Sequence, residues 1–200
     1  MDLKAMTIAT YDRSAEHFAK RYSAFPVRVP QIEKALALLG PRERIRAFEI
    51  GCGYGRDGAA IAERVARYEG IDASKEFIAM AQRDYPSLDC RVADAEAYPF
   101  PPDLDLVFAF ASLLHVDADA LRDIFGRARE AMTPGAIVFA TFQEGKGEDA
   151  RNEPTGMRLF HLYNPATVRG LAGMGFEEAH VRRYVETNGK HWFEIALRRR

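Results

Sequence analysis

The stretch that decides the fold is FEIGCGYGRDG, residues 48–58, in which every second or third residue after Glu49 is glycine. A short apolar run precedes these glycines and an amphipathic run follows them, which indicates a turn between a strand and a helix. Glycine at such a turn lets backbone amides approach a ligand closely. Two nucleoside-binding patterns fit: the dinucleotide spacing Gly53-x-Gly55-x-x-Gly58, and Glu49-x-Gly51-x-Gly53-x-Gly55. The loop alone therefore leaves its ligand open.

Three acidic residues around this loop favour one of the two patterns. Asp72 ends the next apolar run, 21 residues after Gly51, where doubly wound folds place a carboxylate that binds ribose hydroxyls. Asp94 follows the third predicted strand, where it accepts a hydrogen bond from the amine of a base or, alternatively, shapes a turn. Glu49 is a poor neighbour for a pyrophosphate but suits an ammonium group, so these residues favour a cationic nucleoside ligand.

The composition restricts the class of protein. A chain of 200 residues with 48% hydrophobic and 28% charged residues is typical of one soluble globular domain. The net charge of −1 favours no nucleic-acid partner, and the longest apolar run, 106–114, is too short to span a membrane. The two cysteines, Cys52 and Cys90, have neither disulfide-framework nor metal-ligand spacing, so we expect no metal and a reducing, cytoplasmic location.

Short apolar runs alternate with amphipathic runs along the chain, which predicts βαβ units and a mainly parallel sheet. We expect strands near 44–50, 67–71, 89–93, 104–110 and 136–142, and a final hairpin on the Asn-Gly turn at 188–189. We expect a single domain, 1–200, with four parts. These are an N-terminal helical lid (1–43), a cofactor-binding core (44–142), a polar substrate-side loop (143–163), and a C-terminal helix and hairpin (164–200). Within the lid we expect a helix at 13–23.

The segments FEIGCGYGRDG, EGIDAS, VADAEAYPF, DLDLVFAF and TPGA resemble, in order and spacing, those of class I S-adenosylmethionine-dependent methyltransferases, over roughly residues 44–200. The resemblance is to the small-molecule branch that includes quinone-biosynthesis-type enzymes. It implies a Rossmann-like α/β fold with a seven-stranded mixed sheet in the order 3-2-1-4-5-7-6, strand 7 antiparallel, and helices on both faces. It also implies S-adenosylmethionine as cofactor, and Gly58 then serves helix packing.

The resemblance carries cofactor contacts onto this chain. Asp72 would bind the ribose hydroxyls, and Asp94 with Ala95 would recognise the adenine edge. In the lid, Tyr11 would bind the methionine carboxylate, with Tyr22 or Arg28 assisting, although helix packing explains Tyr22 equally well. The methionine portion would lie against Gly51, Gly53 and Gly55. Ala73 would pack beside the adenine, and Phe110, at a strand end, would lie near the methionine amine. Cys52 would serve packing rather than nucleophilic attack.

Methyl transfer needs alignment of the reactants, and it needs a base only if the nucleophile must lose a proton. His115 follows the fourth strand at the expected site edge, and titration near neutrality would suit it to that role, although a packing histidine is an equal alternative. Arg158, His161 and Tyr163 are the predicted substrate-binding residues, with a surface ion pair as the alternative for Arg158.

These observations predict an S-adenosylmethionine-dependent methyltransferase that acts on an O, N or C nucleophile of a small molecule. An NAD(P)-dependent oxidoreductase is the first alternative, but the sequence contains no Tyr-x-x-x-Lys pair of the kind that such enzymes use. A noncatalytic S-adenosylmethionine-binding protein is the second. The sequence does not identify the methyl acceptor, and it fits a monomer or a homodimer.

Overall fold

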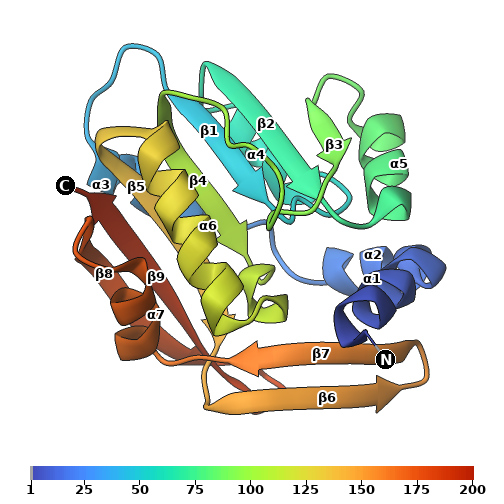
Figure 1. The fold of residues 1–200 in the computed structure, drawn as a ribbon. Helices are drawn as coiled ribbons and strands as arrows, with labels where there is room; N and C mark the ends of the chain where they lie inside the picture. Colours follow the sequence, from blue (N-terminus) through green and yellow to red (C-terminus); the bar gives the residue numbers. More distant parts are fainter. Residues whose placement is uncertain (1) are drawn as a thin grey trace.

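The computed structural model describes residues 2–200, which form an α/β fold around one seven-stranded sheet (Figure 1). The strand order is β3-β2-β1-β4-β5-β9-β8, and β9 runs antiparallel to both of its neighbours. This order confirms the predicted one, since β8 and β9 are the sixth and seventh strands of the sheet. The strands of this sheet are β1 (Arg46–Ile50), β2 (Arg67–Asp72), β3 (Cys90–Val92), β4 (Leu104–Phe110), β5 (Met132–Gln143), β8 (Phe176–Val185) and β9 (His191–Arg199).

Helices cover both faces of the sheet, as predicted, and each face has its own apolar core. In β4, Leu106 and Phe108 pack with the helices of one face, while Val107 and Ala109 pack with those of the other. A strand covered on both sides favours apolar residues at successive positions, which explains the continuous apolar run at 106–110. The helices are α3 (Val29–Leu39), α4 (Arg56–Ala62) and α5 (Lys75–Asp84) on one face, and α6 (Ala118–Ala131) and α7 (Pro165–Ala172) on the other.

The N-terminal segment contains two helices, α1 (Leu3–Arg13) and α2 (Ala15–Ser23), where the sequence predicted only the second. The apolar periodicity misses α1 because threonines form much of its buried surface. Thr7 and Thr10 are both buried. The Thr7 hydroxyl accepts from the amide of Leu159 at 2.9 Å, and the Thr10 hydroxyl donates to the carbonyl of Met157 at 2.8 Å. The helix is therefore fixed by polar contacts with a distant segment.

That distant segment corrects another expectation, because 143–163 is not a loop. It contains β6 (Gly147–Glu153) and β7 (Gly156–Leu162), which pair antiparallel as a separate two-stranded sheet. Figure 1 shows this hairpin below the carboxyl ends of β1 and β4, beside α1. The residues of β6 are polar and mostly half-buried or exposed, so no alternation of apolar residues marks the strand. Backbone pairing and the contact with α1 form it instead.

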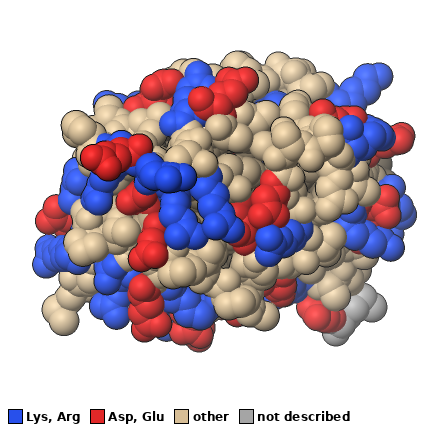
Figure 2. All heavy atoms as spheres, turned by 90° about the horizontal axis from the view of Figure 1, so that it is seen from above, with Lys and Arg blue, Asp and Glu red and all other residues tan. Residues whose placement is uncertain are grey.

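The molecular surface carries mixed charge. Figure 2 views the molecule from above, from the side opposite β6 and β7, and shows Lys and Arg lying beside Asp and Glu across that face. Within residues 2–200, no helix combines the length and the apolar character that a bilayer crossing requires.

Candidate active site

A cavity of about 680 Å³ lies at the carboxyl ends of β1, β2 and β4. The helices α1 and α2, the segment between α2 and α3, β7 and the turn between β8 and β9 complete its walls. This volume suits a nucleoside cofactor together with a small second molecule. Thirteen of the predicted site residues line it: Tyr11, Tyr22, Arg28, Gly51, Cys52, Gly53, Asp72, Ala73, Asp94, Ala95, Phe110, His115 and Arg158.

The glycine loop follows β1 and is held in place by backbone hydrogen bonds. The amides of Gly51 and Cys52 donate to the carbonyl of Ile71 at 2.7 and 3.0 Å. Gly51 has φ +74°, and a Cβ there would lie 2.2 Å from Cβ of Ser112, so only glycine fits. Gly55 has φ +87° and precedes α4, but it lies behind the cavity wall, so it shapes the turn and does not face a ligand.

Gly58 makes room for a buried hydrogen bond, which agrees with the packing role expected for it. A Cβ on Gly58 would lie 2.3 Å from the hydroxyl of Tyr68, which donates to Oε2 of Glu49 at 2.6 Å. Burial and, to a lesser extent, the nearby Asp57 raise the pKa of Glu49 to about 8. Glu49 also lines the cavity, so a cation that binds beside it would favour the ionised form of its carboxyl group.

Asp72 joins the end of β2 to the glycine loop. One carboxylate oxygen accepts from the amide of Gly53 at 2.9 Å and the other from that of Ser74 at 2.8 Å. Burial raises the pKa of Asp72 to about 6, although these two hydrogen bonds oppose the shift. A carboxylate has about four acceptor positions, so two remain for ligand hydroxyls.

Asp94 shapes a turn and also faces the cavity. Its Oδ1 accepts from the amide of Glu96 at 3.0 Å, and its Oδ2 lies 2.5 Å from Nζ of Lys4. Lys4 also pairs with Glu96 at 2.7 Å, so α1 closes this end of the cavity. No sequence pattern marks Lys4, because its partners lie about 90 residues away.

The strand β4 ends in an unusual backbone turn at Phe110-Ala111. Ala111 has φ +53°, which is uncommon for a residue with a side chain, and its amide donates to Thr141 at 2.9 Å. Above the Phe110 ring lies the Arg28 guanidinium, with Cζ 5.4 Å from the ring centroid. Nε of Arg28 is buried and lies 3.5 Å from Oδ2 of Asp57, but it makes no hydrogen bond within residues 2–200, so it can still donate to a ligand acceptor.

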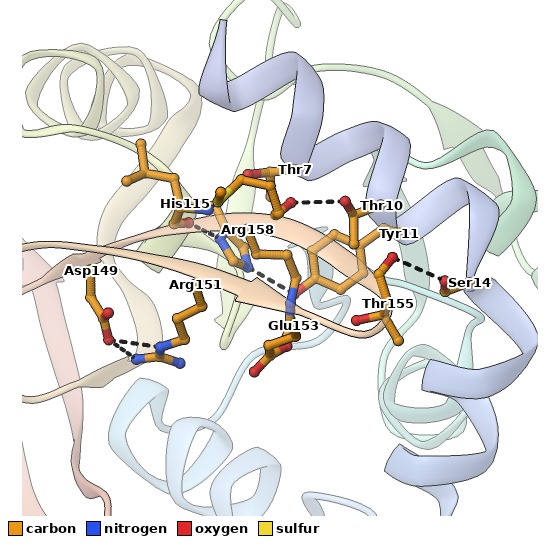
Figure 3. Close-up of polar contacts among 12 residues, drawn as sticks. Thr7, Thr10, Tyr11, Ser14, His115, Asp149, Arg151, Glu153, Thr155 and Arg158 are labelled. Carbon is orange, nitrogen blue, oxygen red and sulfur yellow. Dashed lines mark hydrogen bonds and ion pairs between the residues drawn. The ribbon is translucent and has the colours of Figure 1, made fainter. Parts of the chain in front are cut away.

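A chain of hydrogen bonds crosses the cavity wall from Arg158 to the short helix η1 (Leu113–His115), as Figure 3 shows. Nη1 of Arg158 donates to the Tyr11 hydroxyl at 3.1 Å, and this hydroxyl lies 2.9 Å from Nε2 of His115. Nδ1 of His115 lies 2.6 Å from the carbonyl of Leu159. A carbonyl only accepts, so Nδ1 carries the proton and Nε2 accepts from Tyr11.

This chain corrects the role expected for His115. Burial lowers the pKa of His115 to about 4, so the ring does not titrate near neutrality. Its single acceptor nitrogen is also occupied by Tyr11. His115 is therefore a positioning residue for the Tyr11 hydroxyl in this arrangement, and not a free general base.

Arg158 is itself buried, and it also pairs with a partly exposed carboxylate, the alternative considered for it. The residue is 4% exposed, and one guanidinium nitrogen pairs with Glu153. Its Cζ lies 4.7 Å from the Phe18 ring and 5.1 Å from the Phe160 ring. Tyr22 stacks on the same Phe18 with centroids 5.8 Å apart, so Tyr22 both packs the lid and lines the cavity.

His161 and Tyr163 do not reach the cavity, although both were expected to bind substrate. The alternation along β7 turns Arg158 and Phe160 toward the cavity, whereas the Tyr163 hydroxyl donates to the carbonyl of Val116 at 2.7 Å. Nδ1 of His161 lies 3.6 Å from Glu148. Both are therefore removed from the acceptor-binding candidates. The lining residues that sequence reasoning missed include Lys4, Arg151, Phe160, Lys190 and Trp192.

Cys52 is buried beneath the loop. A hydrogen bond with Cys90, together with burial, raises the pKa of its thiol, which agrees with a packing role and not with a nucleophile. Within residues 2–200, no three His, Cys, Asp or Glu side chains converge as metal ligands.

Residues 47–135 match the family described as a methyltransferase domain. This match covers 89 of the 200 residues, and it contains the glycine loop, Asp72 and Asp94. A cyclopropane mycolic acid synthase of Mycobacterium tuberculosis is 25% identical over 138 residues, which cover 64% of this chain and 47% of that protein. A trans-aconitate 2-methyltransferase of Streptomyces avermitilis is 33% identical over 112 residues, 52% of this chain and 38% of that protein. The chain thus spans about half the length, or less, of these curated relatives.

The fold of this chain agrees with that of solved structures. The N-methyltransferase NodS of Bradyrhizobium japonicum, solved with S-adenosylhomocysteine, superposes with a TM-score of 0.75 at 15% identity, and 99% of each chain is covered. The cavity fits S-adenosylmethionine, the cofactor that the sequence resemblance implies. Glu49 and Asp72 offer carboxylates to a cationic nucleoside, and the buried Nε of Arg28 and hydroxyl of Tyr54 make no hydrogen bond in the described chain.

Proposed function

We propose that this protein transfers the methyl group of S-adenosylmethionine to an O, N or C nucleophile of a small molecule. The observation that carries the proposal is that the glycine loop with Glu49 and Asp72 shares one cavity with the Tyr11–His115–Arg158 chain. The first set suits a cationic nucleoside, and the second offers oriented polar groups to another molecule. A pyrophosphate is a poor fit beside Glu49, which disfavours the oxidoreductase alternative.

In the cofactor half, Asp72 binds the ribose hydroxyls with its two remaining acceptor positions. Asp94 and Ala95 recognise the adenine edge, and Ala73 packs beside it. Nε of Arg28, which makes no hydrogen bond within residues 2–200, and the hydroxyl of Tyr22 bind the methionine carboxylate, while Gly51 and Gly53 allow close backbone approach. When bound, the cofactor supplies a methyl group on a cationic sulfur, so little covalent chemistry is left to the protein.

In the acceptor half, the chain's residues orient a molecule and exclude water. Arg158 and His115 fix the Tyr11 hydroxyl from both sides, and Phe160 provides an apolar wall. This fixed hydroxyl is more suited to orienting the acceptor than to the carboxylate contact that the resemblance implied. Because the acceptor nitrogen of His115 is occupied, a nucleophile with an available lone pair at neutral pH suits the site best. The rate enhancement then comes mainly from alignment.

The names of two relatives support a small acceptor. One is a trans-aconitate 2-methyltransferase and one, from a species of Stutzerimonas, is a ubiquinone biosynthesis O-methyltransferase. The proposal includes a cytoplasmic location, supported by the free cysteines Cys52 and Cys90. It includes either a monomer or a homodimer.

The proposal is tested by incubating the protein with S-adenosylmethionine and pools of small metabolites and measuring S-adenosylhomocysteine. We expect product in at least one pool, and none from an Asp72→Ala variant in that pool. If the protein binds S-adenosylmethionine but no pool yields product, the noncatalytic alternative is correct.

A further inference from the structure

The cavity divides into an acidic and a basic part. Carboxylates outnumber cations in the part next to β1, β2 and β3, where the acidic residues are Glu49, Asp57, Asp72, Asp94 and Glu96. The cations there already have partners: Lys4 pairs with Asp94 and Glu96, and Arg28 and Arg56 pair with Asp57. Arginines and a lysine line the part formed by α2, β6, β7 and the turn between β8 and β9: Arg21, Arg151, Arg158 and Lys190. A cation and an anion are thus favoured in different parts of one cavity.

Most charges in the basic part already have partners. Arg151 donates to Asp149 at 2.7 Å and to Gln143 at 2.9 Å, and its Cζ lies 3.7 Å from the Phe160 centroid. Arg158 pairs with Glu153, as Figure 3 shows. Glu186, the other carboxylate here, accepts from the side-chain amide of Asn188 at 3.1 Å.

Arg21 and Lys190 have no carboxylate within ion-pair distance among residues 2–200, but Arg21 is exposed whereas Lys190 is half-buried. Burial lowers the pKa of Lys190, and Arg151 lowers it further, while Glu153 and Asp149 oppose the shift from beyond ion-pair distance. A bound anion would give the Lys190 charge its first close partner.

Two hydrogen-bond donors in the same part also lack acceptors. Nε of Arg158, a residue that is 4% exposed, and Nε1 of Trp192 are both buried without a partner in the described chain. Both residues line the cavity. A buried donor without an acceptor destabilises the folded protein, so a ligand oxygen here satisfies an existing requirement.

We propose that Lys190, Arg158 and Trp192, here called the basic wall, bind a carboxylate or phosphate group of the methyl acceptor. Lys190 supplies the uncompensated charge, and Nε of Arg158 and Nε1 of Trp192 donate hydrogen bonds. The inference rests on the proposed function, whose acceptor it specifies as an anion. A neutral acceptor would leave the Lys190 charge unpaired.

The basic wall is continuous with the hydrogen-bonded chain described above. Arg158 belongs to both, since its Nη1 donates to Tyr11 while its Nε remains without a partner. An anion on the basic wall therefore holds the rest of the acceptor beside the Tyr11 hydroxyl. The carboxylate of the cofactor has a different donor, Arg28, which lies over Phe110.

The test is a calorimetric titration of the protein saturated with S-adenosylhomocysteine. The probes are succinate, benzoate and phenyl phosphate, each compared with a neutral counterpart: succinamide, benzamide and phenol. We expect at least one acid to bind and its neutral counterpart not to bind. Binding of succinate or benzoate would identify a carboxylate as the bound group, and binding of phenyl phosphate would identify a phosphate.

Two variants with a matched control locate the binding. Lys190→Gln should weaken the bound acid about tenfold, and Trp192→Phe, which keeps an aromatic ring, about threefold. Lys34→Gln removes the same charge from an exposed position on α3 outside the cavity and should change nothing. Equal binding of acids and neutral counterparts, no binding of either, or equal losses in Lys34→Gln would overturn the inference. Failure to bind S-adenosylhomocysteine would instead overturn the proposed function on which it rests.

Discussion

The hydroxyl of Tyr11 lies 2.9 Å from Nε2 of His115, across 104 residues of sequence. The contact joins α1 to the segment that follows β4, and it occupies the one nitrogen with which His115 accepts a proton. The second ring nitrogen donates to Leu159 of β7 at 2.6 Å. His115 therefore connects the lid, the sheet edge and the β6–β7 hairpin.

Removing the Tyr11 hydroxyl should raise the pKa of His115. In Tyr11→Phe, Nε2 loses a hydrogen bond that favours the neutral ring, so protonation becomes easier, while burial still keeps the pKa below 6.5. The measurement is a titration of the histidine ring protons by NMR, with the resonance assigned by its loss in His115→Gln. Tyr98→Phe removes a hydroxyl that bonds to Glu69, outside this chain, and should leave the His115 titration in place.

His115 should also make the folded protein less stable in acid. Its pKa is about 4 in the folded state and about 6.5 when unfolded, so the folded protein binds this proton less readily. Its contribution to stability is fully present above pH 6.5 and is lost as the pH falls toward 4. Between pH 7 and 4.5 this loss is about 2 kcal/mol. Urea unfolding of the wild type and His115→Gln at both values measures it, and an equal pH dependence of the two proteins would refute it.

Alanine at Gly58 should disrupt the buried Tyr68–Glu49 hydrogen bond. A new Cβ would lie 2.3 Å from the Tyr68 hydroxyl and 3.1 Å from Oε2 of Glu49, so Gly58→Ala should cost about 2 kcal/mol of unfolding free energy. Gly126, in the middle of α6, has open space around the corresponding position. Gly126→Ala should therefore stabilise the protein by about 0.5–1 kcal/mol. Chemical denaturation compares the two variants, and equal effects would contradict the packing account.

Asp72→Ala should weaken both the cofactor site and the loop. The substitution removes the acceptor of the Gly53 and Ser74 amides, so we expect a loss of about 1–3 kcal/mol in stability. Affinity for S-adenosylhomocysteine should fall at least about tenfold, since the ribose hydroxyls lose their acceptor. Asp84→Ala removes a carboxylate paired with Arg83 at the end of α5 and serves as control. Unchanged affinity in Asp72→Ala would mean that another residue binds the ribose.

The sheet and the cofactor edge were predictable because local signals specify them. The continuous apolar run at 106–110 is typical of a strand covered on both faces, and the Asn-Gly turn predicts the final hairpin. Asp72 and Asp94 end parallel strands, so the topology alone brings both carboxylates to one edge.

The lid and the acceptor side were less predictable because contacts between distant segments form them. The helix α1 buries threonines against β7, and neither element shows apolar periodicity. Because the strand β7 was not predicted, the alternation of its side chains between two faces was not predicted either. Nothing in the sequence therefore showed that Arg158 faces the cavity and His161 does not. The pKa of His115 depends on burial by these same segments. Lys190 and Trp192 reach the cavity only because β9 pairs with β5 beside it.

Calorimetric titration of the wild-type protein with S-adenosylhomocysteine and, separately, with NADH tests the central claim most directly. We predict that S-adenosylhomocysteine binds to one site per chain with a dissociation constant on the order of micromolar, and that NADH produces no binding heat. Binding of NADH without binding of S-adenosylhomocysteine would contradict the assignment of this cavity.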